Sequence, residues 1–312
     1  MKVVALAGGV GAGKFLRGLV RAVAPADVTA VVNTGDDLWI SGLRVCPDLD
    51  SVTYWLGEAG DRDRGWGRRD ESFRMLEELR RFDPDAAWFG LGDLDLATHL
   101  YRTRLLGEGR SLSEVTERIT ARFGVTSRLL PMTDEPVETR IEVVADGRAL
   151  DLHFQEYWVR RRARDDVKAV RFEGAGTAAP ARDVLHAIEA ADAVVVCPSN
   201  PVVSIGPILA VRGIRDAVAA RPVVGVSPIV AGRPLAGMAD RLMPVVGLEV
   251  SAVGAARAYA GVLDAWVIDN ADRGSVDRAR GELGIAVAAT DTVMVDDAVA
   301  EALARTALGL VA

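Results

Sequence analysis

Apolar positions along the chain fall into two patterns, short unbroken runs and longer stretches in which they recur every three or four residues. Unbroken runs are typical of strands buried on both faces of a parallel sheet, and the longer period is typical of the helices that cover it. The pattern predicts an α/β fold, a Rossmann-like three-layer parallel sheet. We expect strands at 2–7, 28–33, 86–91, 193–197, 223–226 and 266–268, and helices at about 15–23, 48–56, 70–82, 112–123, 182–191 and 298–308.

A different pattern interrupts the middle of the chain. Residues 137–144 and 148–154 alternate between apolar and polar positions on either side of Asp146-Gly147, a strong signal for a β-hairpin. No repeat or low-complexity linker separates it from the rest. We therefore expect one α/β enzyme domain over 1–312, with a core of about 1–58 and 166–312. A smaller inserted helical and hairpin region is expected at about 59–165.

Composition narrows the class of protein. The chain has 312 residues, half of them apolar, and a net charge of −7, which argues against a nucleic-acid binder. No apolar run approaches the roughly 20 residues of a membrane span, and the N-terminus reads as a strand rather than a signal peptide. Cys46 and Cys197 are too few and too far apart for a disulfide framework or a zinc set. A cytoplasmic protein without a membrane partner is expected.

Four carboxylates follow the strand expected at 28–33: Asp36, Asp37, Asp48 and Asp50. Grouped at the C-terminal end of a strand, where open α/β sheets bind ligands, they repel one another unless a cation lies among them. Carboxylates also hold Mg²⁺ together with substrate phosphates. The alternative is a solvated loop of turn-forming residues, with Asp48 or Asp50 capping the next helix.

Glycines follow the first strand, in the segment from Gly8 to Lys14. A strand, a glycine loop and a helix together aim backbone N–H groups at an anion. Neither common phosphate motif is complete, because Phe15 stands where a Walker loop needs Ser or Thr, and Lys14 stands where a dinucleotide loop needs Gly. Either Gly9, Gly11 and Lys14 contact phosphate, or the glycines serve only close helix packing.

Further carboxylates, Asp93 and Asp95, follow the strand expected at 86–91. Asp95, His99 and Arg102 are spaced i, i+4 and i+7, so they share one face of the next helix. This polar stripe is either a salt-bridged surface or the wall of a site.

A rigid polar loop follows the strand at 193–197. Its prolines fix the turn, and Ser199, Asn200 and Ser204 provide polar groups at the strand end. Either the loop binds phosphate or a base, or turn chemistry alone explains it.

Taken in order, these blocks resemble one family, the 2-phospho-L-lactate transferases of coenzyme F420 biosynthesis, including the phosphoenolpyruvate transferase branch. Any single block is weak, whereas eight in order are specific, and similarity continues through VSPIVAGRPLAGMADRLM. One departure is Leu94, where the family's GD-R-D block has arginine. The blocks are GGVGAGK, NTGDD, PDLD, WFGLGDLDLATH, LSEVT, LPMTD, FQEYWV and CPSNPVVSIGPILAV.

The resemblance implies a Mg²⁺-dependent transfer. The terminal ribityl hydroxyl of the deazaflavin FO attacks a guanosine diphospho donor carrying phospholactate or phosphoenolpyruvate, and GMP leaves. It also implies a homodimer. Asp36, Asp37, Asp48 and Asp50 would hold the metal, and Asp50 or Asp48 would accept the hydroxyl proton. Residues expected to bind substrate are Gly9, Gly11, Lys14, Asn33, Thr34, Asp93, Asp95, Ser199, Asn200 and Ser204.

Two alternatives belong to other classes. The first is a nucleotide-sugar-binding regulatory protein of the related gluconeogenesis-factor family, which shares the glycine-rich start and an Asn-Thr-x-Asp-Asp turn. The segment Leu38-Trp39-Ile40, followed by PDLD, favours the transferase. The second is a divergent P-loop kinase, which the Phe15 mismatch disfavours.

Overall fold

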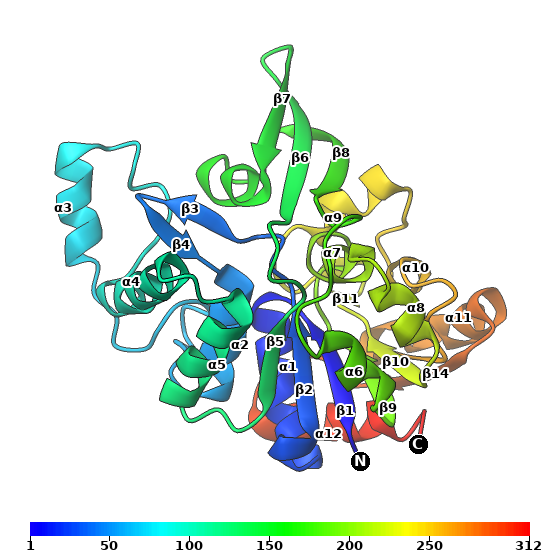
Figure 1. The fold of residues 1–312 in the computed structure, drawn as a ribbon. Helices are drawn as coiled ribbons and strands as arrows, with labels where there is room; N and C mark the ends of the chain where they lie inside the picture. The colour runs from blue at the N-terminus through cyan, green and yellow to red at the C-terminus, as the bar shows by residue number, and fades with distance from the viewer.

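Seven parallel strands form the central sheet of the computed structural model, which describes residues 1–312 (Figure 1). Their order is β5-β2-β1-β9-β10-β13-β14, so the chain builds the sheet outward from β1 in one direction and then from β9 in the other. The order reverses between β1 and β9, the position at which such sheets bind ligands. The strands are β1 (Val3–Ala7), β2 (Val28–Val32), β5 (Arg128–Pro131), β9 (Ala193–Val196), β10 (Val223–Val226), β13 (Ala265–Asp269) and β14 (Ala286–Thr290).

Helices cover both faces of this sheet, which confirms the predicted three-layer α/β fold. Successive residues of β1 enter different cores: Val3 and Ala5 pack with α1 and α12, whereas Val4 and Leu6 pack with α6, α8 and α10. This alternation is the two-residue period of a strand. The helices are α1 (Gly9–Ala22), α2 (Pro47–Leu56), α3 (Arg74–Phe82), α4 (Asp93–Gly107), α5 (Leu112–Arg122), α6 (Val184–Glu189), α7 (Gly206–Ala210), α8 (Ile214–Ala219), α9 (Ala239–Leu242), α10 (Ala252–Arg257), α11 (Val276–Leu283) and α12 (Asp297–Leu308).

Smaller antiparallel sheets lie beyond the ends of the central strands. The predicted hairpin forms β6 and β7, and β8 pairs with the other edge of β6. In Figure 1 this three-stranded sheet stands above the centre of the molecule, next to the β3–β4 hairpin. The strands of the smaller sheets are β3 (Leu38–Ile40), β4 (Leu43–Val45), β6 (Glu138–Ala145), β7 (Arg148–His153), β8 (Asp166–Glu173), β11 (Ile229–Val230) and β12 (Arg233–Pro234).

Two predicted elements are wrong. Residues 86–91 form no strand; Leu91 is buried against Leu38, Ile40 and Val45 of the β3–β4 hairpin, so this apolar run fills a small separate cluster. Asp93 therefore begins α4 and does not follow a sheet strand. The first helix starts at Gly9 rather than near residue 15, so most of the expected glycine loop is helical.

The borders of the inserted region stay a prediction, and two strands bear on them. β5, within 59–165, forms one edge of the central sheet, whereas β8, after residue 165, pairs with β6 of the hairpin.

The first and last long helices pack closely together. A Cβ atom at Gly18 of α1 would lie 2.1 Å from the backbone of Ala300 in α12. Beside this contact Arg17, only 6% exposed, donates from Nε to Asp297 Oδ1 at 2.8 Å. The Arg17 guanidinium lowers the pKa of Asp297 to about 2.

We predict that Asp297→Asn lowers the free energy of unfolding by about 2 kcal/mol at pH 7, because a carboxyl with a depressed folded-state pKa stabilises the fold while ionised. The sign follows from the two pKa values: the contribution is complete above about pH 5 and is lost as the pH falls towards 2. Urea unfolding of both proteins should show a smaller difference at pH 3 than at pH 7. A difference independent of pH would contradict the ion pair.

Candidate functional site

Several polar residues expected at the sheet edge do meet there. Asn33 directly follows β2, and its Nδ2 lies 2.9 Å from Asp48 Oδ2, 3.2 Å from Asp36 Oδ1 and 3.3 Å from the carbonyl oxygen of Val203. Gln155, from beyond β7, points its Nε2 at Asp36 Oδ2 at 3.4 Å. We call Asn33, Asp36, Asp48 and Gln155 the Asn33 cluster. All four residues are at most 6% exposed.

The two carboxylates of the Asn33 cluster have no cationic partner, since no arginine, lysine or histidine lies within ion-pair distance of Asp36 or Asp48. Burial raises the pKa of Asp48 to about 7. Burial also raises the pKa of Asp36, and the nearby charge of Asp48 raises it further. Two buried carboxylates that share one amide donor therefore favour a proton or a metal ion between them.

Asp37 turns away from this pair. Its Oδ2 lies 3.5 Å from Nη2 of Arg44 on β4, and neither carboxylate oxygen has a hydrogen-bond partner. Burial raises its pKa to about 6, although the charge of Arg44 opposes the shift. Thr34, earlier in the same turn, is also buried, and its hydroxyl has no partner.

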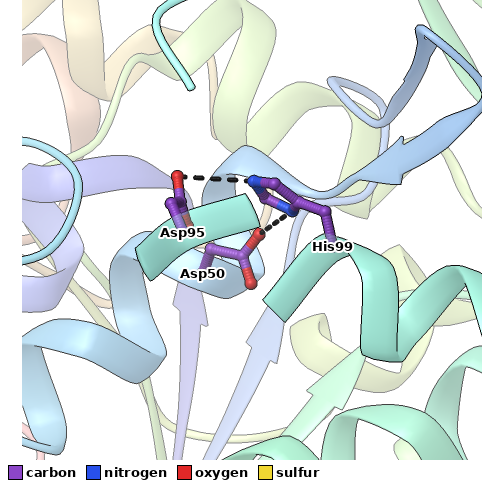
Figure 2. Close-up of side chains that lie close together, drawn as sticks. All are labelled: Asp50, Asp95 and His99. Atoms are coloured by element: carbon purple, nitrogen blue, oxygen red, sulfur yellow. Dashed lines mark ion pairs between the residues drawn. The ribbon is translucent and has the colours of Figure 1, made fainter. Parts of the chain in front are cut away.

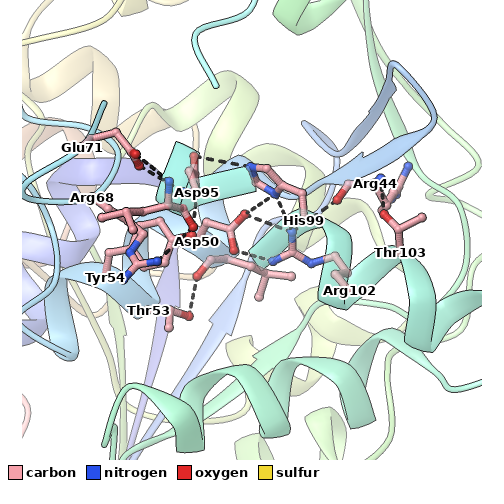
Figure 3. A network of polar contacts seen from close by, with 12 residues as sticks. Arg44, Asp50, Thr53, Tyr54, Arg68, Glu71, Asp95, His99, Arg102 and Thr103 are labelled. Carbon is pink, nitrogen blue, oxygen red and sulfur yellow. Dashed lines mark hydrogen bonds and ion pairs between the residues drawn. The ribbon is translucent and has the colours of Figure 1, made fainter. Parts of the chain in front are cut away.

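Asp50 lies in a second group of side chains, between α2 and α4 (Figures 2 and 3). Arg102 contacts both carboxylate oxygens of Asp50, with Nη1 3.1 Å from Oδ2. His99 lies between two acids, its Nδ1 3.6 Å from Asp50 Oδ2 and its Nε2 3.3 Å from Asp95 Oδ2. The hydroxyl of Tyr54 donates to the other oxygen of Asp95. We call these five residues the Asp50 cluster.

Charge in the Asp50 cluster is compensated internally. Burial lowers the pKa of Arg102, but the charge of Asp50 raises it by more, so the pKa lies above its usual value. Burial raises the pKa of Asp95, yet His99 and Tyr54 together lower it by more, so the pKa lies below its usual value. The stripe Asp95, His99 and Arg102 predicted from the helical spacing is therefore buried and paired within the Asp50 cluster, whereas its role as the wall of a site stays a prediction.

The glycines at the start of α1 make close contacts with the loop after β9. A Cβ atom at Gly11 would lie 2.5 Å from the carbonyl oxygen of Pro198, and one at Gly8 would lie 2.6 Å from Cβ of Ser204. Ser199 donates from Oγ to the carbonyl oxygen of Gly8 at 2.8 Å. Close packing thus accounts for these two glycines, whereas contact with phosphate stays a prediction. Gly9 has a φ of +69° and adjoins Asp48.

The remaining predicted residues contact other groups of the protein. Asn200 Oδ1 accepts from the N–H groups of Val202 and Val203, which caps the turn before α7. Asp93 accepts from Ser72 and from N–H groups at the start of α3, so its carboxylate is a cap for α3. The ammonium group of Lys14 lies 5.4 Å from the centre of the Trp55 ring.

The sequence did not single out Gln155 or Tyr54 as site residues. Gln155 belongs to the Asn33 cluster and Tyr54 to the Asp50 cluster. The FQEYWV block contained Gln155, but no pattern in the sequence places residue 155 against the turn at 33–37. Tyr54 lies one helical turn after Asp50 at i, i+4, so a helix predicted over these residues places both side chains on the same face.

Comparison with known proteins gives a consistent result. The family model described as "2-phospho-L-lactate transferase CofD" matches residues 3–308. A phosphoenolpyruvate transferase of Streptomyces griseus is 50% identical over 99% of this chain and 98% of its own length. The enzyme of that name from Mycolicibacterium smegmatis is 44% identical, with coverage of 99% and 98%.

Among solved structures, a member of the upf0052 family from Bacillus halodurans superposes with a TM-score of 0.62 at 18% identity, covering 98% of each chain. This likeness concerns the fold alone. No helix in the structure combines the length and apolar character needed to cross a membrane.

Proposed function

The chain belongs to the 2-phospho-L-lactate transferase CofD family and is a transferase, and on that premise we propose its substrates and metal. The membership confirms the resemblance that the sequence blocks indicated. We propose that the protein moves a phosphoenolpyruvyl or 2-phospho-L-lactyl group from a guanosine diphospho donor to the terminal hydroxyl of FO, with release of GMP. The names of its relatives favour the phosphoenolpyruvyl donor.

The observation that carries the proposal is the buried pair Asp36 and Asp48, which shares Asn33 and has no cation. Carboxylate oxygens in this arrangement suit Mg²⁺, which binds through one or two carboxylates and substrate phosphates. Asp50 suits it less, because Arg102 occupies both of its oxygens. We therefore assign Mg²⁺ to Asp36 and Asp48. When bound, it would neutralise the donor diphosphate and the charge that develops during transfer.

The protein side chains have separate tasks in this scheme. Asn33 holds the two carboxylates in one orientation, and its backbone N–H is fixed by the carbonyl oxygen of Ala7 at 3.0 Å. Asp48 remains available to contact the reacting groups, whereas Asp50 is engaged by Arg102. We therefore favour Asp48 over Asp50 for direct contact and assign Asp50 to fixing the first turn of α2.

Mass spectrometry of the product formed from FO with each donor tests the reaction. The expected product is the phosphodiester of FO with release of GMP. If the protein binds a guanosine or nucleotide-sugar ligand but forms no product with either donor, the regulatory binding protein is favoured instead.

Removal of metal provides a prediction of its own. Because the carboxylate pair needs a cation, treatment with EDTA should reduce turnover to below about a hundredth of that of the untreated protein, and excess Mg²⁺ should restore it. Mg²⁺ should also raise the Tm of the wild-type protein but not that of Asp36→Asn. Full turnover in EDTA would contradict the assignment, as would an equal rise in Tm for the variant.

A further inference from the structure

His99 and Tyr54 are the most enclosed side chains of the Asp50 cluster, each with 1% of its surface exposed. His99 projects from α4 into the space between Asp50 and Asp95, as Figure 2 shows. Both ring nitrogens therefore face charged groups. What each nitrogen can do depends on which of them carries the hydrogen.

The neighbours of His99 determine that hydrogen's position. Nη1 of Arg102 lies 3.2 Å from Nδ1 of His99, and a guanidinium can only donate. Nδ1 must then be the acceptor, so the hydrogen of the neutral ring is on Nε2. That nitrogen faces Asp95 Oδ2 at 3.3 Å, without a well-aligned hydrogen bond and with no other partner.

The same geometry weighs against a metal ion in this cluster. Ligand atoms of Asp50, Asp95 and His99 lie within 4.8 Å of one another, a spacing that could hold a cation. However, Arg102 already places a positive charge on both oxygens of Asp50 and uses the lone pair of His99 Nδ1. The cluster is therefore complete without a metal.

We propose that His99 is a positioning residue for the transfer reaction. As an acceptor at Nδ1 it fixes the Arg102 guanidinium, which holds Asp50 through two contacts. Asp50 and Asp48 share the first turn of α2, so this chain of contacts sets where Asp48 lies at the sheet edge. The effect on turnover rests on the proposed function, whereas the hydrogen position on His99 does not.

Three variants separate positioning from proton transfer and from simple packing. His99→Asn places an amide oxygen where Nδ1 of the imidazole lies and so keeps the acceptor for Arg102, and its kcat should stay within about threefold of wild type. His99→Phe keeps a ring of similar size without an acceptor. Its kcat should fall about 10- to 100-fold with KM for the donor nearly unchanged, because displaced supporting residues reduce activity by such factors. His99→Leu also lacks an acceptor and should resemble the Phe variant, which keeps the test valid if Phe does not fold.

Two results would overturn the proposal. If the Phe and Leu variants are as active as the Asn variant, the acceptor has no role. If Asn is as inactive as Phe, His99 transfers a proton or makes a contact that only imidazole provides.

A spectroscopic measurement tests the geometry independently of the reaction. The chain has three histidines, so ¹⁵N-histidine NMR spectra can be assigned with three single substitutions. We expect a hydrogen on Nε2 of His99 and none on Nδ1, and a hydrogen on Nδ1 would overturn the proposal. If the wild-type protein forms no product but shows the expected tautomer, the proposed function fails while the arrangement of His99 stands.

Discussion

Asp48→Asn is expected to reduce kcat/KM by at least about 100-fold, the effect of losing one preorganised electrostatic group in an active site. At the same time the free energy of unfolding should stay unchanged or rise. The wild-type carboxylate is buried beside Asp36 without a cation, so replacing it by a neutral amide of the same shape removes repulsion. Such a gain in stability with a loss of activity is typical of residues that serve function.

Steady-state kinetics and urea unfolding of the metal-free protein measure the two effects. Asp277→Asn is a matched control, because the Asp277 side chain is fully exposed on α11 and the same substitution should change neither quantity. Calorimetric titration with Mg²⁺ should show binding to the control and none to Asp48→Asn. Near-normal turnover, or a loss of more than about 2 kcal/mol in unfolding free energy, would contradict the role of Asp48.

Asp50→Ala should greatly lower the free energy of unfolding, in contrast to Asp48→Asn. Removing one partner of a buried ion pair leaves the other charge uncompensated, and the usual cost is about 3–5 kcal/mol. Arg102 is 2% exposed, so water cannot replace the lost carboxylate. We expect Arg102→Met alone to be destabilising as well, because the charge of Asp50 would then be unpaired.

A double-mutant cycle measures this interaction. The protein with both Asp50→Ala and Arg102→Met should be more stable than the sum of the two single losses predicts, since neither charge remains. The cycle needs no assay of activity. Additive losses would show that the two side chains contribute independently and that the pair does not hold α2 against α4.

The central strands were largely predictable from the sequence, and the edge strands were not. β1, β2, β9, β10 and β13 are runs rich in Val, Ala, Ile and Leu and buried on both sides, a pattern typical of the middle of a parallel sheet. β5 is short and ends in Pro131, and β14 is rich in alanine and only partly buried. The apolar run at 86–91 had the pattern of a strand but packs on the β3–β4 hairpin, a distinction that only tertiary structure makes.

The site was also only partly predictable, because contacts between residues far apart in the sequence were not. Asn33, Asp36 and Asp48 lie close together in sequence, and a strand end followed by a helix start brings them together. Arg102 lies 52 residues after Asp50, on a helix whose packing against α2 no periodicity specifies. The helical spacing showed that Asp95, His99 and Arg102 share a face but not which residue they meet.

The pairing of α1 with α12 has a consequence for biosynthesis. Phe15, Leu16 and Leu19 of α1 share a core with Leu303 and Leu308, which the ribosome adds much later. At about 5–20 residues per second, roughly 15–60 s of translation separate the two helices. Throughout that interval the part of α1 that packs on α12 lacks this cover, so apolar side chains of α1 stay exposed on the emerging polypeptide.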